Sequence, residues 1–334
     1  MEEMEKIKLS FCIPTWNRAN ELKECLDSII EQVVEGNYPV EIFISDNAST
    51  DGTAEVLDKY AKKYKFIRYS RNEKNLGYDL NLITAIEKSE GEYAWLFGDD
   101  DILERGALEK VQNIIEIYKP VYISTNYYYW RKPKEDFEER EVVKIKNHQS
   151  FMERVKTDIP SIDFEKLLNL RNHWFGFLSS NIIKKNSVNL ESVKNNIEKI
   201  RSWSQIDIVA QSLSKGKGFV TSYYCVGSRF GNGRENPCTF SKLMPEAFKY
   251  VFRKHKVREN TERRIFYGIR KTFLSPKSIL VSKVKGESLD ISPEIRPEFY
   301  MFLFKVIPKS LIKNGWKIKR FLSGKGFSIP MDKI

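Results

Sequence analysis

Short apolar runs alternate with helical patterns over the first 125 residues, and this alternation limits the possible folds more than any other feature of the chain. Strands are expected at 8–13, 40–45, 66–69, 93–97 and 121–124, and helices at 21–32, 51–63, 80–88 and 104–118. Asn20 is the expected cap of the first helix, and Ser49 or Thr50 that of the second. Strands that alternate with helices of this length predict βαβ units and a mostly parallel sheet, an α/β fold.

Polar clusters follow three of these strands. They are 14–18 (PTWNR), 46–49 (DNAS) and 99–101 (DDD). Ligands of open parallel sheets bind beyond the carboxyl ends of the strands. Three such loops at one edge therefore predict a single binding cleft.

The acidic cluster Asp99-Asp100-Asp101 follows a strand and the hinge residue Gly98. Three adjacent carboxylates repel one another, so a cation is expected between them, and hard oxygen ligands suit Mg²⁺ or Mn²⁺. The alternative is a solvated acidic turn in which Asp101 caps the next helix. Asp46 leaves a similar choice, because its carboxylate can accept a hydrogen bond from a nucleotide or belong to a helix-capping turn.

Composition excludes several classes of protein. With 334 residues, 41% of them hydrophobic, the chain can build a sizeable core. Its three histidines are scattered, and its four cysteines form no CxxC pair, so a zinc site is not expected. The cysteine pattern indicates a protein of a reducing compartment. The acidic N-terminus lacks the pattern of a secretory signal, and no apolar run has the length of a membrane span. A cytoplasmic protein is expected.

Charge is distributed unevenly. Residues 241–334 hold 22 basic and 8 acidic residues, a net +14, whereas the rest holds 34 and 37, a net −3. Amphipathic stretches at 299–313 and 316–322 interleave aromatic residues with lysines. This pattern favours a helical segment that lies on an anionic membrane surface, or else an ordinary helical subdomain with a solvated basic face. Nucleic acid is not expected as a partner, since no recognised binding motif is present.

Four motifs in order, 13–18 (IPTWNR), 45–53 (SDNASTDGT), 72–77 (NEKNLG) and 98–101 (GDDD), resemble those of family 2 glycosyltransferases. The resemblance covers roughly the first 110 residues. It implies a GT-A fold, a nucleotide-diphosphate sugar donor with UDP favoured, a divalent metal and inversion at the anomeric carbon. The GDDD form is similar to that of a subgroup near the abequosyltransferases of surface-polysaccharide assembly.

By this resemblance, donor-binding residues follow from the motif positions. They are Pro14, Thr15, Arg18, Asp46, Asn75, Gly77, Asp99 and Asp100. Asp46 would bind the base, and Asp100 with Asp101 would hold the metal. Gly98 stands where many family members have an aspartate, which leaves open which carboxylate contacts ribose and which contacts metal.

The resemblance also implies an aspartate base on a helix about a hundred residues after the metal loop. Asp207 is the candidate, with Ile206 in place of the first acid of the usual pair, and Asp158 and Asp163 are its rivals. His173 and Trp174 would line the acceptor side, or else simply pack in the core. Arg229 and Arg234, in a glycine-containing loop, would bind the diphosphate or lie on a polar surface.

The predicted organisation is a GT-A domain over 1–240, with a nucleotide-sugar half (1–125) and an acceptor half (126–240), followed by a basic helical segment over 241–334. The predicted activity is sugar transfer to a saccharide or lipid-linked acceptor, at the inner face of the cytoplasmic membrane. The alternatives are a nucleotide-sugar or carbohydrate binding protein without turnover, a sugar nucleotidyltransferase, and an adaptor that acts through its basic tail.

Overall fold

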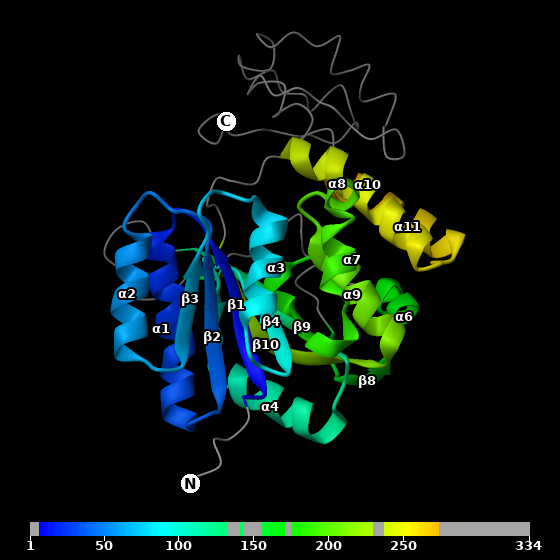
Figure 1. Cartoon of the computed structure of the whole chain (residues 1–334). Helices are drawn as coiled ribbons and strands as arrows, with labels where there is room; N and C mark the ends of the chain where they lie inside the picture. Colours follow the sequence, from blue (N-terminus) through cyan, green and yellow to red (C-terminus); the bar gives the residue numbers. More distant parts are fainter. Residues whose placement is uncertain (1–6, 132–140, 143–154, 171–174, 230–236, 274–334) are drawn as a thin grey trace, which may run out of the picture. The chain divides into compact units, whose positions relative to one another are not determined.

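The computed structural model describes residues 7–131, 141–142, 155–170, 175–229 and 237–273 (Figure 1). The chain divides into two compact units, 1–232 and 233–334. The predicted stretches at 299–313 and 316–322 lie outside the described residues. Within the described part, no helix combines the length and apolarity needed to cross a membrane.

The first unit is built on one sheet in the order β3-β2-β1-β4-β9-β6-β10-β5, with β7 beside β6 and β8 beside β10. The strands are β1 (Leu9–Thr15), β2 (Val40–Asp46), β3 (Ile67–Arg71), β4 (Tyr93–Leu96), β5 (Ile102–Leu103), β6 (Tyr122–Arg131), β7 (Glu141–Val142), β8 (Ile159–Ile162), β9 (Asn181–Lys184) and β10 (Gly218–Arg229). Pairing is parallel from β3 through β4, as predicted. Strand β9 then runs antiparallel between β4 and β6, so the complete sheet is mixed.

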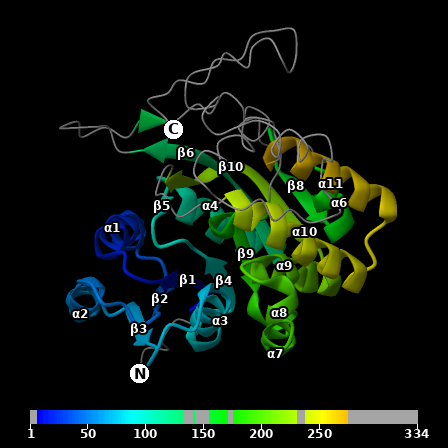
Figure 2. The ribbon, with the colours of Figure 1, turned by 90° about the horizontal axis from the view of Figure 1, so that it is seen from above.

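Helices cover both faces of this sheet. They are α1 (Ala19–Gly36), α2 (Thr53–Lys63), α3 (Tyr78–Lys88), α4 (Ala107–Tyr118), α6 (Phe164–Asn169), α7 (Leu190–Lys194), α8 (Ile197–Ile200) and α9 (Ser204–Lys215). Figures 1 and 2 place α1 and α2 on the face of β1 and β2 opposite α3. Helix α3 contacts α7, and α7 contacts α9, so these two helices from the second half of the unit continue the layer that α3 begins.

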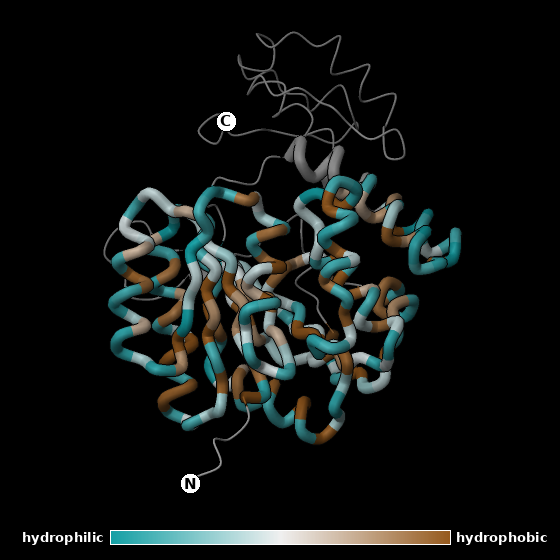
Figure 3. The backbone as a smooth tube through the Cα atoms, in the orientation of Figure 1, coloured by the Kyte–Doolittle hydropathy of each residue, from teal (hydrophilic) through white to brown (hydrophobic). Residues whose placement is uncertain are grey.

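Strand β1 shows why the sheet lies at the centre. All seven of its residues are buried, as expected for a strand covered on both faces. Leu9, Phe11 and Ile13 pack into the same core cluster as the apolar faces of α1 and α4, where the Phe11 ring stacks on Trp95 at 5.0 Å between centroids. Figure 3 shows hydrophobic residues along the strands and mixed hydropathy along the helices that cover them.

Most predicted elements are present, but their ends differ. Helix α1 begins before Asn20, which lies inside it, and the amide of Ala19 donates to the Asp51 carboxylate at 3.2 Å. Asp51 also accepts from the Thr53 amide at 3.0 Å, so neither predicted cap of α2 is used. One carboxylate therefore serves the starts of two helices.

The second unit contributes two described helices, α10 (Pro237–Lys254) and α11 (Glu259–Phe273). They pack against each other, with the rings of Phe252 and Phe266 6.2 Å apart. The expectation of helices after the α/β core is confirmed.

Candidate functional site

Three parallel strands end in register at one edge of the sheet. Thr15 is paired with Asp46, and Asp46 with Arg71. The loop after β1 interlocks with the loop after β2, because Asn17 donates from its amide to the Ser49 hydroxyl at 2.9 Å, while its side-chain oxygen accepts from the Thr50 amide at 2.7 Å. The first two polar clusters predicted from the sequence thus lie side by side.

Asn47 holds the third predicted motif against the second. Its side-chain oxygen accepts from the Leu76 amide at 2.9 Å, and its nitrogen donates to the Asn75 side chain at 2.8 Å and the Gly77 carbonyl at 3.2 Å. Gly77 has φ 83° and ψ 169°, a conformation essentially restricted to glycine. Asn75 and Gly77 therefore border the same edge, as the motif positions predicted.

Asp46 is fully buried, and its two carboxylate oxygens differ. One accepts from the Ser49 amide at 3.1 Å. The other, Oδ2, accepts no hydrogen bond from the residues that the structure describes and lies 3.6 Å from a guanidinium nitrogen of Arg71. A buried carboxylate oxygen normally has hydrogen-bond donors, so this atom is a candidate contact for a ligand.

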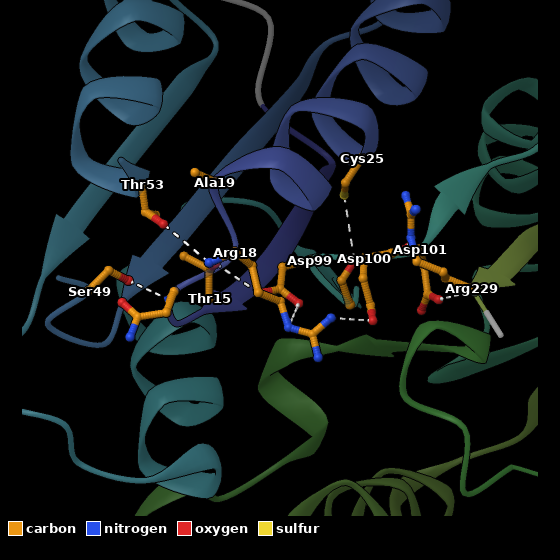
Figure 4. A network of polar contacts seen from close by, with 12 residues as sticks. Thr15, Arg18, Ala19, Cys25, Ser49, Thr53, Asp99, Asp100, Asp101 and Arg229 are labelled. Carbon is orange, nitrogen blue, oxygen red and sulfur yellow. Dashed lines mark hydrogen bonds and ion pairs between the residues drawn. The ribbon is translucent and has the colours of Figure 1, made fainter. Parts of the chain in front are cut away.

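The acidic loop lies next to this cluster, as Figure 4 shows. The hydroxyl of Thr15 donates to Asp99 at 2.8 Å. The Arg18 guanidinium forms an ion pair with Asp100 and lies 3.7 Å from the other oxygen of Asp99. Burial alone would lower the pKa of Arg18, but these two carboxylates raise it above its ordinary value. Asp99 and Asp100 thus share one cation.

Asp101 has a different environment from its two neighbours. One of its oxygens accepts from the Ser179 hydroxyl at 2.5 Å and the other from the Arg229 amide at 3.3 Å. Burial, followed by the charge of Asp100, raises its pKa well above the usual range. Asp101 is not the cap of a helix, because α4 begins at Ala107 with Gly106 before it, so the alternative of a capping turn at Asp101 is wrong.

The same contacts account for the glycine that departs from the family pattern. A Cβ on Gly98 would lie 2.7 Å from a carboxylate oxygen of Asp101 and 3.3 Å from the Ser179 hydroxyl. The Gly98 amide itself donates to that hydroxyl at 2.8 Å. The space of a side chain at position 98 is therefore filled by Asp101, which is turned inward.

Arg229 anchors the acidic loop from the end of β10. Its Nε donates to the Asp100 carbonyl at 3.2 Å, its guanidinium pairs with Glu24 of α1, and it stacks on the Trp130 ring at 4.4 Å from the centroid. Its side chain is only 9% exposed. These contacts favour a role in holding the loop over the predicted direct contact with a diphosphate.

Two carboxylates of the acidic loop, Asp99 and Asp100, are placed to hold a divalent cation. Among the described residues, no three or more acidic, histidine or cysteine side chains converge on a metal position. Asp99 and Asp100 nevertheless both face one positive charge, that of Arg18. Mg²⁺ and Mn²⁺ sites that handle phosphates often use one or two carboxylates, with water and phosphate oxygens as the remaining ligands. Asp99 and Asp100 suit such a site better than Asp100 and Asp101.

Asp207 lies in the first turn of α9 and is fully buried, and it accepts from the Gln211 side chain at 3.0 Å. Its rivals have structural roles. Asp158 pairs with Lys110 at 2.8 Å and accepts from the Ser222 amide at 2.7 Å, and Asp163 caps α6 through the Lys166 amide at 2.8 Å. Burial alone would raise the pKa of Asp158, but Lys110 and Ser222 lower it to about 2.

Asp79 connects the donor side of the edge to α9 and was not recognised from the sequence. It lies in the first turn of α3, two residues after Gly77, and is 7% exposed. Its carboxylate accepts from the amides of Ser202 at 2.6 Å and Ser204 at 3.1 Å, where α9 begins. Burial raises its pKa, despite these bonds. An acidic residue in a first helical turn is so common that nothing in the sequence marks this long-range contact.

The predicted acceptor residues His173 and Trp174, and the predicted diphosphate ligand Arg234, lie outside the described residues. The segment that follows His173 and Trp174 is attached to α9, because the Gln205 side chain donates to the Gly176 carbonyl at 3.1 Å. Sequence reasoning also missed Ser179, since a lone serine carries no pattern.

Comparison with known proteins matches residues 10–176, half of the chain, to the sequence model described as "Glycosyl transferase family 2". An abequosyltransferase, RfbV, from Salmonella typhimurium is 44% identical over 116 residues, 34% of each chain. A cholesterol galactosyltransferase from Borreliella burgdorferi is 32% identical over 114 residues, 34% of this chain and 31% of that one. The matched part thus spans about a third of the length of these relatives.

Solved structures share the fold at low identity. Staphylococcus aureus TarS 1-349 in complex with UDP-GlcNAc matches with a TM-score of 0.55 and 18% identity, over 89% of this chain and 80% of that one. The mannosyltransferase PcManGT from Pyrobaculum calidifontis, in complex with GDP-Man and Mn²⁺, matches with a TM-score of 0.54 and 14% identity, over 93% and 88%. The predicted GT-A fold is confirmed, and the matched family model, which spans half of the sequence, shows that this chain is a member of glycosyl transferase family 2.

Proposed function

We propose that the chain is a metal-dependent, inverting glycosyltransferase that moves a sugar from a nucleotide-diphosphate sugar to an acceptor hydroxyl. One observation carries the proposal. Asp46 buries a carboxylate oxygen without a hydrogen-bond donor from the described residues, at the edge where all four motifs meet. A base N–H or a ribose hydroxyl would supply the missing donor.

The donor would lie along this edge. Pro14 and Thr15 end β1 beside Asp46, and the loop with Asn75 and Gly77 closes the far side of the cluster. Arg18 would face the diphosphate, since a guanidinium matches phosphate oxygens well. UDP is the nucleotide that the family resemblance favours, and TarS, which shares the fold, is known with UDP-GlcNAc, whereas PcManGT is known with GDP-Man.

Asp99 and Asp100 would hold Mg²⁺ or Mn²⁺, and Asp101 would keep the loop in shape from beneath. When bound, the ion supplies positive charge against the charge that develops on the departing diphosphate. The Mn²⁺ in the PcManGT complex supports this choice. The remaining stabilisation would come from Arg18 and from the fixed positions of the loop residues.

Asp207 is the proposed base. Asp158 and Asp163 are bound in structural contacts, and the segment after His173 and Trp174 joins α9 near Asp207. The Asp207 carboxylate would take the proton of the acceptor hydroxyl. The hydroxyl oxygen would attack the anomeric carbon from the face opposite the phosphate, and the nucleoside diphosphate would leave as its bond to that carbon breaks. Because Asp207 is buried, its test must separate proton transfer from packing.

The acceptor class is proposed from the relatives. Abequosyltransferase RfbV is named for the sugar that it transfers, and a poly(ribitol-phosphate) beta-glucosyltransferase of Bacillus spizizenii, 33% identical over 110 residues, is named for a polymeric acceptor. From the resemblance to enzymes of surface-polysaccharide assembly, the acceptor would be a saccharide, carried on a lipid. The basic C-terminal segment, net +14 over 241–334, would then hold the enzyme on an anionic membrane surface.

The test is a donor screen with purified protein and Mn²⁺, which follows release of nucleoside diphosphate from a panel of nucleotide sugars. Metal-dependent release from one donor, lost in Asp100→Ala, would support the proposal. Asp207→Asn preserves volume and should still bind that donor but lose transfer to an acceptor. If donors bind with metal and none is turned over, the alternative of a binding protein that kept the fold would be favoured instead.

A further inference from the structure

We propose that Arg18 makes the binding of the divalent cation and of the diphosphate depend on each other. This inference rests on the proposed function, since it concerns the same donor site. In the structure the Arg18 guanidinium is the cation that Asp99 and Asp100 share. A metal ion that uses these carboxylates must compete with Arg18, and a diphosphate offers the guanidinium another partner.

The geometry sets up this competition. Arg18 pairs with Asp100 and lies 3.7 Å from Asp99, and the three side chains are only 12–22% exposed. Charges in such a partly buried site are screened less by solvent than surface charges are. A divalent ion placed beside the guanidinium would be repelled by it. The guanidinium and the metal ion therefore weaken each other's binding to Asp99 and Asp100.

The backbone of Arg18 is fixed independently of its side chain. Its amide donates to the Thr53 hydroxyl at 3.3 Å, and its carbonyl accepts from the Leu22 amide at 2.9 Å in the first turn of α1. The guanidinium can therefore exchange carboxylates for phosphate oxygens without unfolding of the loop. Reciprocity then follows from linkage: if the diphosphate removes Arg18 from the carboxylates, the cation binds more tightly, and the cation favours the diphosphate by the same factor.

Arg71 offers a matched control on the same edge. It also faces a buried carboxylate, with 3.6 Å between its guanidinium and Asp46, but it does not pair with the acidic loop. Neutralising Arg71 removes one positive charge near the site and leaves Asp99 and Asp100 with their partner. Any general effect of charge on metal affinity will appear in both variants, whereas a specific competition will appear only at Arg18.

The experiment measures Mn²⁺ binding to the full-length chain by titration calorimetry, with and without UDP, for wild type, Arg18→Gln, Arg18→Lys and Arg71→Gln. Without UDP, R18Q is expected to bind Mn²⁺ about 10-fold more tightly than wild type, R71Q within about 2-fold of it, and R18K in between. UDP should tighten Mn²⁺ binding in both wild type and R18Q, because its phosphate oxygens can be metal ligands, but by a smaller factor in R18Q, where no guanidinium has to leave the carboxylates. Thermal unfolding checks that each variant is folded.

Two results would overturn the inference. The first is an R18Q variant that binds Mn²⁺ no more tightly than wild type, or that is matched by R71Q, while wild type still binds Mn²⁺ with UDP. That outcome leaves the proposed function intact. The second is a wild type and an R18Q that bind no Mn²⁺ with or without UDP, which would remove the proposed metal site and this inference together.

Discussion

The donor edge and the second half of the first unit contribute to the site in different ways. The donor edge takes Thr15, Arg18, Asp46 and Asn47 from the ends of neighbouring parallel strands and the loops after them. The second half sends single side chains or amides to that edge from distant positions, namely Ser179 and Arg229 to the acidic loop and Ser202 and Ser204 to Asp79. We infer that the first region supplies the ligands and the second fixes their positions.

The substitution that should lower activity most lies in the donor edge. Asp100→Ala removes a proposed metal ligand and the ion-pair partner of Arg18, and should lower donor turnover by about 100-fold or more, since such charge stabilisation is worth several kcal/mol. Asp58→Ala, at an exposed position of α2, makes the same chemical change away from the edge and should leave turnover unchanged. Nucleoside diphosphate release measures both, and equal losses would refute the distinction.

Asp79→Ala tests the link between the two regions. It leaves the amides of Ser202 and Ser204 without their acceptor, at a cost of about 2–4 kcal/mol in the free energy of unfolding. Because α9 carries Asp207, turnover should fall about 10- to 100-fold with little change in UDP affinity. Asp163→Ala removes the cap of α6 instead and should lower stability by about 1 kcal/mol without loss of turnover. A D79A variant with normal turnover would show that α9 needs no such anchor.

Gly98→Ala tests the shape of the acidic loop. The new Cβ would meet the Asp101 carboxylate at 2.7 Å, so the loop must shift, and we expect a loss of about 1–3 kcal/mol in stability and about 10-fold in affinity for UDP with Mn²⁺. At Gly52, on the same edge, a Cβ has its nearest neighbour at 3.8 Å. Gly52→Ala should therefore change neither quantity appreciably, as urea unfolding and calorimetry will show. An equal effect of both changes would contradict the packing explanation.

The smallest expected effect concerns Asp158, one of the rivals of Asp207. Its pKa is lowered from an ordinary value of 3.8 to about 2 in the folded chain, so its stabilising effect is present above pH 4 and is lost as the pH falls through 2. Asp158→Asn should cost about 1 kcal/mol at pH 6, and the difference from wild type should shrink at pH 2.5. Turnover should hardly change. A large loss of turnover with normal stability would make Asp158 the better base.

The two regions also differ in how far their structure could be predicted from the sequence. The parallel strands and the loops that follow them depend on local pattern, so the sequence predicted that the loop with Asp46 lies beside the loop after β1. The roles of Asp46, Asn75 and Gly77 at the donor stay predictions. The orientation of the acidic loop was not predictable, because it depends on Ser179, 78 residues away, which holds Asp101 inward and leaves Asp99 and Asp100 to Arg18. The start of α1 was missed for the same reason, since its Ala19 amide donates to Asp51, 32 residues away. At α2 the contact is local, because Asp51 accepts from the Thr53 amide two residues later, and only the choice among neighbouring polar residues was wrong.

Amide hydrogen exchange with and without UDP and Mn²⁺ shows where the nucleotide binds, and it requires no knowledge of the sugar or the acceptor. We expect UDP with Mn²⁺ to slow amide exchange in the four edge segments, 14–18, 46–51, 72–77 and 98–101. Exchange at the far ends of the same strands should not slow. In Asp46→Asn the slowing should weaken at 46–51 and 72–77 first. Slowing elsewhere in the chain, or none at saturating UDP and Mn²⁺, would contradict the claim that this edge is the nucleotide-sugar site.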